Sequence, residues 1–224
     1  MTTDTTPRQA VRRARGRGLT FAGLLLLALG LGALGWASWD TFVRPVVDAE
    51  VAAAQVAALR DQWSGHSAAA TPSATLPSTG DAVALITIEG LNDAAPQVVL
   101  AGTDDATLTL GLGWYDGTTP PGELGNFAVA GRGDPNGPLA GLASVPAGTR
   151  VVIETAEAVH TYQLRERPGD TVVAATDTWV IQPVPGRPEL RPTEALLTIT
   201  STYDLFRPDT RLVAFGVLVE TRPR

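Results

Sequence analysis

The sequence predicts an all-β domain, a sandwich or a small barrel, that follows an N-terminal membrane-spanning helix. From residue 81 onward, short runs rich in β-branched residues alternate with turns that contain Gly or Pro. Before that point the chain has an uncharged apolar stretch at 19–39 and then a segment rich in Ala, Ser, Thr and Pro. No unit of roughly 20–50 residues repeats, which excludes a solenoid or a propeller.

The composition excludes several functional classes. The 224 residues contain no cysteine and only two histidines, His66 and His160. A disulfide framework, a cysteine nucleophile and a thiolate or histidine-rich metal site are therefore excluded, and no cofactor is implied. Five of the 17 basic residues lie in the first 18 residues, together with only one of the 23 acidic residues. The remainder is strongly acidic, which argues against nucleic-acid binding.

The uncharged stretch at 19–39, "LTFAGLLLLALGLGALGWASW", is long enough to cross a hydrocarbon core of roughly 30 Å. Arginines cluster on its N-terminal side, so the tail is expected in the cytoplasm and the C-terminal bulk outside. A cleaved signal peptide is the alternative. The apolar run exceeds the usual length of about 7–15 residues and no small-residue cleavage site follows it, which favours an uncleaved signal anchor.

Two segments follow the anchor. Residues 46–63, "VVDAEVAAAQVAALRDQW", lack Gly and Pro and predict a helix whose weak apolar pattern favours a solvated spacer. Residues 64–80 are Ser-, Ala-, Thr- and Pro-rich and predict a flexible linker around His66. The predicted organisation is a basic cytoplasmic tail, a transmembrane anchor, a juxtamembrane helix, a linker and an extracellular β domain, at residues 1–18, 19–39, 40–63, 64–80 and 81–224.

The C-terminal domain contains eight candidate strands. They lie at residues 84–89, 97–102, 126–131, 149–155, 159–166, 170–177, 196–202 and 211–220. Two further stretches, "DDATLTLG" (104–111) and "PLAGLAS" (138–144), look like single helical turns. Eight short strands at this spacing with few helical stretches predict a sandwich or a small barrel.

Residues 82–220 resemble the sortases, in particular the class E type of high-GC Gram-positive bacteria. The resemblance rests on "LITI" (85–88), "GLGWY" (111–115), "PGELGN" (121–126) and the two terminal strands in "LLTITSTYDLFRPDTRLVAFG" (196–216), in the family's order. The sequence departs from the family pattern at Glu89, where the family has Pro, and at Trp114, where it has His. The resemblance implies an eight-stranded sortase β-barrel tethered outside the membrane.

The family cleaves peptide sorting signals with a Cys nucleophile, a His for proton transfer and an Arg that steadies the oxyanion. Matched to this sequence, the His position carries Arg132, the Cys position carries Thr202, and the Arg position is retained as Arg211. Arg cannot be deprotonated in a protein, and a Thr hydroxyl needs an adjacent base. The resemblance therefore implies a sortase-family chain that is inactive as a cysteine transpeptidase and serves as a peptide- or partner-binding module at the cell surface.

Three other functions stay open. One is a hydrolase or transpeptidase of altered mechanism that uses Thr202, with Asp204 nearby. Another is a structural or accessory role beside an active sortase. Finally, Arg132-Gly133-Asp134 matches the tripeptide that adhesion receptors bind, although it occurs by chance in many chains. His160, in the middle of a predicted strand, is expected to be a packed histidine without a catalytic role.

Overall fold

The computed structural model describes residues 25–33, 36, 49–64, 77–135, 137–204 and 207–224. The chain divides into two units, Met1–Arg44 and Pro45–Arg224. In the first unit, residues 25–33 are helical. Within the described residues, no helix has the length and apolar character needed to cross a bilayer. Most of the predicted span at 19–39 lies outside the described residues, as do residues 65–76 of the predicted linker at 64–80.

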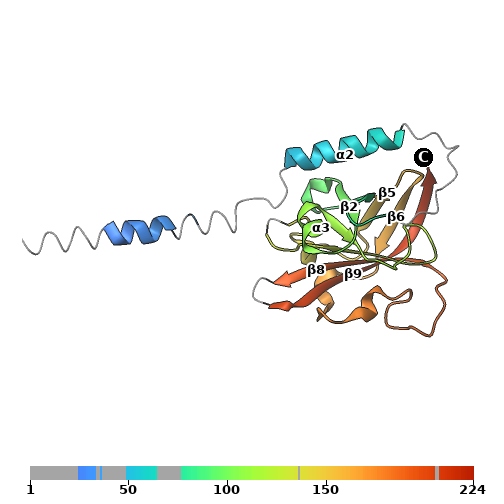
Figure 1. Ribbon diagram of the computed structural model, residues 1–224. Coiled ribbons are helices and arrows are strands. Elements are labelled where there is room, and N and C mark those ends of the chain that lie inside the picture. The colour runs from blue at the N-terminus through green and yellow to red at the C-terminus, as the bar shows by residue number, and fades with distance from the viewer. Residues whose placement is uncertain (1–24, 34–35, 37–48, 65–76, 136, 205–206) are drawn as a thin grey trace, which may run out of the picture. The chain divides into compact units, whose positions relative to one another are not determined.

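The second unit is a closed eight-stranded β-barrel with one additional strand (Figure 1). The barrel is all-β with short helical turns, as the sequence predicts. Its strands are β1 (Ala82–Ile88), β2 (Gln97–Ala101), β3 (Leu112–Trp114), β4 (Gly125–Gly131), β5 (Arg150–Glu154), β6 (Ala158–Leu164), β8 (Ala195–Asp204) and β9 (Arg207–Pro223). Around the barrel they run β1, β2, β3, β4, β8, β9, β6, β5 and back to β1.

The barrel closes because β9 is long enough to pair twice. One edge of β9 pairs with β8 and the other edge pairs with β6, both antiparallel. The pairs β2–β3 and β4–β8 are parallel, which requires the long connections that carry the helical turns and the loop before β8.

One of the eight predicted strands was assigned wrongly. Residues 170–177 form only the short strand β7 (Val172–Ala174), which pairs with β9 outside the closed ring. The true eighth strand is β3, which the sequence analysis missed because "LGW" is three residues long and has no β-branched residue. Gly113 is required there, since a Cβ atom would collide with the Gly102 carbonyl oxygen.

The core fills the barrel interior. Inward-facing residues of every barrel strand are almost fully buried, and Phe127 and Tyr162 are the largest of them. The two predicted helical turns are present as α3 (Asp105–Leu110) and the 3₁₀ turn η2 (Leu142–Ser144). Asp104 caps α3, because its side chain accepts hydrogen bonds from the backbone N–H groups of Ala106 and Thr107.

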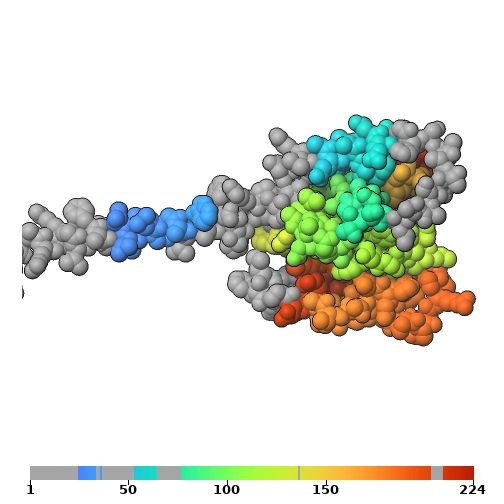
Figure 2. Space-filling model, in the orientation of Figure 1, coloured from blue at the N-terminus to red at the C-terminus, as the bar shows by residue number. Residues whose placement is uncertain are grey.

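Helix α2 (Ala49–Ser64) lies where the sequence predicts a juxtamembrane helix, but it packs on the barrel (Figure 2). Val56 and Leu59 are buried against apolar residues of β1 and β2, with Trp63 beside them. Arg60 Nη2 lies 2.5 Å from Glu154 Oε1, and Arg224 binds the other oxygen of that carboxylate at 2.8 Å. The expected solvated spacer is therefore wrong for this helix, because one weak apolar stripe finds a matching patch on the sheet.

Candidate functional site

The ends of three neighbouring strands bring the sequence-predicted positions together. In the parallel pair β4–β8, Gly131 lies opposite Ser201, so Arg132 follows the strand end beside Thr202. In the antiparallel pair β8–β9, Thr202 lies directly opposite Arg211. We call Arg132, Thr202 and Arg211 the terminal row. Their chemical role stays a prediction, but their proximity is set by the strand register.

The Thr202 side chain is exposed, and its hydroxyl is already engaged. The backbone N–H of Gly133 donates a hydrogen bond to Thr202 Oγ1 at 2.9 Å. Ser201 faces the opposite side, as alternation requires, and is buried, with its hydroxyl donating to the Thr202 carbonyl at 3.1 Å. A Cβ atom at residue 133 would collide with Ser201 Oγ and the Thr202 carbonyl oxygen, so only glycine allows this approach.

Arg132 and Asp134 pair with each other. Arg132 Nε lies 3.4 Å from Asp134 Oδ2, with the two side chains 42% and 22% exposed. Asp134 Oδ1 is buried without a hydrogen-bond partner among the described residues. Because the two charged groups face each other and Gly133 is bound to β8, the tripeptide is not displayed as a free loop, which removes support for adhesion-receptor binding.

Arg211 is partly buried between two strands. It lies opposite Thr202 on one side and opposite Val173 of β7 on the other. Its Nη1 donates a hydrogen bond to the Thr210 carbonyl at 3.1 Å. The guanidinium is thus held at the edge of the terminal row by its own strand.

Behind the terminal row, the same outer face of β8 carries two more threonines that the sequence analysis did not single out. Thr200 Oγ1 lies 2.9 Å from the Tyr115 hydroxyl. Thr198 Oγ1 donates to Asn126 Oδ1 at 2.9 Å and also lies 3.1 Å from the Val180 carbonyl. The alternating Thr residues in "LTITST" were the available signal, since alternate residues of a strand share one face.

The 3₁₀ turn η4 (Thr178–Ile181) covers this face of the sheet. Asn126 Nδ2 donates to the carbonyls of Val180 and Gln182, at 3.2 and 3.0 Å. Asn126 and Thr198 are 1% and 0% exposed, so bulk solvent does not reach the polar cluster under the turn. These bonds fasten the loop before β8 to the two strands that end in the terminal row.

His160 lies far from the terminal row, as a packed histidine should. It is in β6, opposite Thr221 at the far end of β9 from Arg211, and its Nδ1 lies 3.1 Å from Thr221 Oγ1. Burial lowers the pKa of its imidazole. The other histidine, His66, and the side chain of Asp204 lie outside the described residues.

The terminal row contains two guanidinium groups and a hydroxyl group, but no side chain described by the structure acts there as a base. Neither arginine can take a proton from Thr202. Among the side chains that the structure describes, no group of three His, Asp or Glu residues converges as a metal site would. What the terminal row can do chemically is bind an anionic or carbonyl group between guanidinium and hydroxyl donors.

Comparison with known proteins agrees with this architecture. The model of the sortase domain family matches residues 86–219, more than half of the chain, and the chain belongs to the sortase family. Sortase SrtE1 from Streptomyces coelicolor is 27% identical over 227 residues, which cover 97% of this chain. The match spans 60% of that relative's length.

Solved sortases share the fold. Sortase E from Streptomyces avermitilis is 31% identical, with a TM-score of 0.58 over 65% of this chain and 93% of that chain. Sortase E1 from Streptomyces coelicolor, solved with a tripeptide in its active site, is 23% identical with a TM-score of 0.56, covering 66% of this chain and 94% of that one. The second likeness shows the fold alone.

Proposed function

We propose that this chain is a membrane-anchored, cell-surface sortase-family protein that does not act as a cysteine transpeptidase and instead binds peptides or partners at the terminal row. The observation that carries the proposal is that the chain has no cysteine, with Thr202 at the strand position where the family resemblance puts the nucleophile. Peptide sorting signals are the substrates of sortases, which makes a peptide the expected guest.

The contacts of the terminal row support loss of the transfer chemistry. Thr202 Oγ1 accepts a hydrogen bond from Gly133 N–H, and no described side chain that could serve as a base contacts it. Arg132, at the family His position, stays protonated at any physiological pH. His160 is buried at the other end of β9. A leaving amine would therefore find no described group that could cycle a proton.

The same contacts support binding. Arg132 is 42% exposed, and its pair with Asp134 is of the weak, solvent-exposed kind. Because Asp134 is only 22% exposed and its Oδ1 is buried, a guest carboxylate would bind the exposed side of Arg132 alongside Asp134 and leave that ion pair in place. Arg211 is on β9, with β8 between it and Arg132, and can hold the same group from the other side, since guanidinium groups bind carboxylates through two parallel hydrogen bonds.

A titration with a sorting-signal peptide tests the binding function. The full chain in a mild detergent should bind the peptide, and Arg211→Ala should weaken binding by about tenfold. Arg150→Ala, an exposed arginine on β5, is the matched control and should bind like the wild type. Equal and poor binding by the wild type and Arg211→Ala would contradict the proposal.

The alternative function is a hydrolase or transpeptidase of altered mechanism that uses Thr202. The exposed Thr202 hydroxyl beside Arg211 is the observation that favours it. A fluorogenic sorting peptide distinguishes the two functions. We expect no turnover by the wild type, and turnover by Thr202→Cys combined with Arg132→His would support the match of positions to the family. Turnover by the wild type that Thr202→Val abolishes would establish the alternative.

A structural accessory role stays a third proposal, with an active sortase as partner. The cheapest observation that favours it would be a neighbouring gene for a sortase that retains both Cys and His. Co-purification of that enzyme with this chain, and not with a variant altered in the terminal row, would tie the partner to the same site.

The proposed topology places the chain in the plasma membrane as a single-pass protein, with its N-terminus cytoplasmic and its barrel outside. The uncharged stretch at 19–39 and the arginines before it support this. Because the chain has no cysteine of its own, a maleimide can react only with the cysteine that a single substitution introduces. In intact cells a membrane-impermeant maleimide should label Ser64→Cys but not Thr5→Cys, which should react only after permeabilisation. The reverse pattern would overturn the topology.

A further inference from the structure

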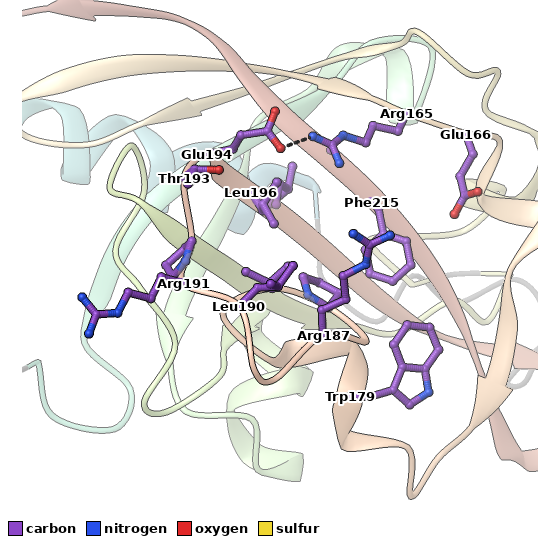
Figure 3. A pocket seen from close by; sticks show the side chains of 15 residues that line it. Arg165, Glu166, Trp179, Arg187, Leu190, Arg191, Thr193, Glu194, Leu196 and Phe215 are labelled. Carbon is purple, nitrogen blue, oxygen red and sulfur yellow. Dashed lines mark hydrogen bonds and ion pairs between the residues drawn. The ribbon is translucent and has the colours of Figure 1, made fainter.

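The loop before β8, the start of β8, the middle of β9 and the residues after β6 line a pocket of about 470 Å³ (Figure 3). We call it the loop pocket. The residues that define its chemistry are Arg165, Trp179, Arg187, Leu190, Glu194 and Phe215. Its volume lies within the range of roughly 300–1,000 Å³ that is usual for ligand sites.

The loop pocket is separate from the terminal row. Leu196 lines the pocket, and Thr202 stands six residues further along β8, about 20 Å away at the usual rise per residue. Between them, Thr198 and Asn126 are buried beneath the Val180 carbonyl. A ligand in the pocket therefore does not occupy the terminal row.

The pocket offers an apolar surface that the fold leaves partly open. Trp179 packs against Phe215 with ring centroids 6.0 Å apart and an interplanar angle of 32°. Trp179 and Leu190 are still 37% and 45% exposed. Pro185 and Pro192 also line the pocket. Walls of aromatic and proline side chains suit an extended peptide, which inserts a side chain and keeps its backbone at the surface.

Some arginines in the pocket lining have no carboxylate partner among the described residues and can bind a ligand carboxylate. Arg165 Nη2 is held by Glu194 Oε2 at 2.6 Å, and Glu166 accepts a hydrogen bond from the Thr171 hydroxyl at 2.9 Å. No ion pair or side-chain hydrogen bond joins Arg187 or Arg191 to another residue that the structure describes. In Figure 3 the Arg187 side chain extends toward Phe215, whereas Arg191 points away from the pocket.

We propose that the loop pocket binds an extended segment of a partner protein in which an apolar side chain is flanked by carboxylates. The apolar side chain enters beside Trp179, Leu190 and Phe215, and a flanking carboxylate pairs with Arg187. Arg187, which extends into the pocket and has no carboxylate partner among the described residues, favours an acidic segment over a basic one. The site is independent of the terminal row and of the function proposed for it.

The probe is the peptide acetyl-Asp-(4-fluorophenylalanine)-Asp-amide, observed by fluorine NMR while the full chain in a mild detergent is titrated in. Empty micelles are measured in parallel to subtract partitioning of the probe. We expect saturable binding that weakens as salt is raised, because part of it is electrostatic. Arg187→Glu and Trp179→Ala should each weaken binding by about tenfold.

The matched controls are a charge reversal elsewhere and two altered probes. Arg150→Glu should change affinity less than about twofold, since Arg150 is exposed on β5 and does not line the pocket. The analogues with Asn in place of Asp, or Ala in place of the fluorinated residue, should bind at least about tenfold more weakly.

Three results would overturn the proposal. The first is the absence of saturable binding. The second is an equal loss of probe affinity with Arg150→Glu and Arg187→Glu, which would show that only the net charge of the protein matters. The third is a loss with Arg211→Ala as large as that with Arg187→Glu, which would assign the probe to the terminal row. Because the third result identifies the other site, failure here and failure of the proposed function are distinguishable.

Discussion

The backbone N–H of Gly133 donates a hydrogen bond to the hydroxyl of Thr202 at 2.9 Å, so the residue after the end of β4 is fastened to the end of β8. The bond joins residues 69 positions apart in the chain. It holds Arg132 beside Thr202 and fixes the spacing of the terminal row.

Replacement of Gly133 should disturb the terminal row directly. In Gly133→Ala the new methyl group collides with Ser201 Oγ and the Thr202 carbonyl oxygen, so the loop must move and the bond to Thr202 is lost. We expect a loss of about 1–3 kcal/mol in the free energy of unfolding and faster amide hydrogen exchange at residues 132–135. Gly30→Ala is the control, since no atom lies within 4 Å of its Cβ position and its φ is outside the left-handed region. It should leave exchange at 132–135 unchanged, and the idea fails if Gly133→Ala does the same.

The threonines on the outer face of β8 should contribute unequally to stability. Thr198→Val removes a hydroxyl that is 0% exposed and leaves Asn126 Oδ1 without that donor, so we expect a loss of about 1–3 kcal/mol. Thr202→Val should cost about 0.5–1 kcal/mol, because water can replace an exposed partner. Urea unfolding of both variants checks the order. A larger loss of stability with Thr202→Val would show that the hydrogen bonds under η4 contribute less to stability than the bond between Gly133 and Thr202.

Stability should fall with decreasing pH because of His160. Burial lowers the pKa of its imidazole in the folded chain, so below its unfolded pKa of about 6.5 the unfolded chain binds the proton more readily. The contribution is therefore complete above that pH and is lost as pH falls toward the folded pKa. Urea unfolding at about pH 7.5 and about pH 5.5 measures it. His160→Gln should show a smaller decrease than the wild type, and the His66→Gln control should show the wild-type decrease. An unchanged decrease in His160→Gln would exclude His160 as the cause.

Release of α2 should leave the barrel folded. Leu59→Asp places a carboxylate in the contact of Val56 and Leu59 with β1 and β2, where it would be desolvated. We expect deuterium uptake over residues 49–64 to rise by at least about twofold, with little change in the barrel strands, because α2 packs against only one part of their outer surface. Ala58→Asp, on the exposed side of the same helix, is the matched control. Equal protection in the two variants would show that the apolar contact does not hold α2.

The elements confirmed from sequence are those that local pattern defines. β1, β2 and β4 are short runs of apolar and β-branched residues bounded by turn residues, and each was predicted within a few positions. β3 was missed because three residues with a central Gly carry no such pattern, and its pairing with β2 and β4 is what makes it a strand. β7 was assigned too much length because its β-branched run is not paired beyond Ala174.

The sequence by itself determined that this chain has no cysteine for transpeptidation and that its domain is all-β, and its resemblance to the family predicts that Arg132, Thr202 and Arg211 take the His, Cys and Arg positions. These follow from composition, from residue alternation and from the order of short motifs. The tertiary structure decided that β9 closes the ring through β6, that α2 packs on the sheet, that Gly133 binds Thr202, and that the loop before β8 forms a pocket. Each of these depends on residues far apart in the chain, whose contact is fixed by strand register and packing and leaves no local signal in the sequence.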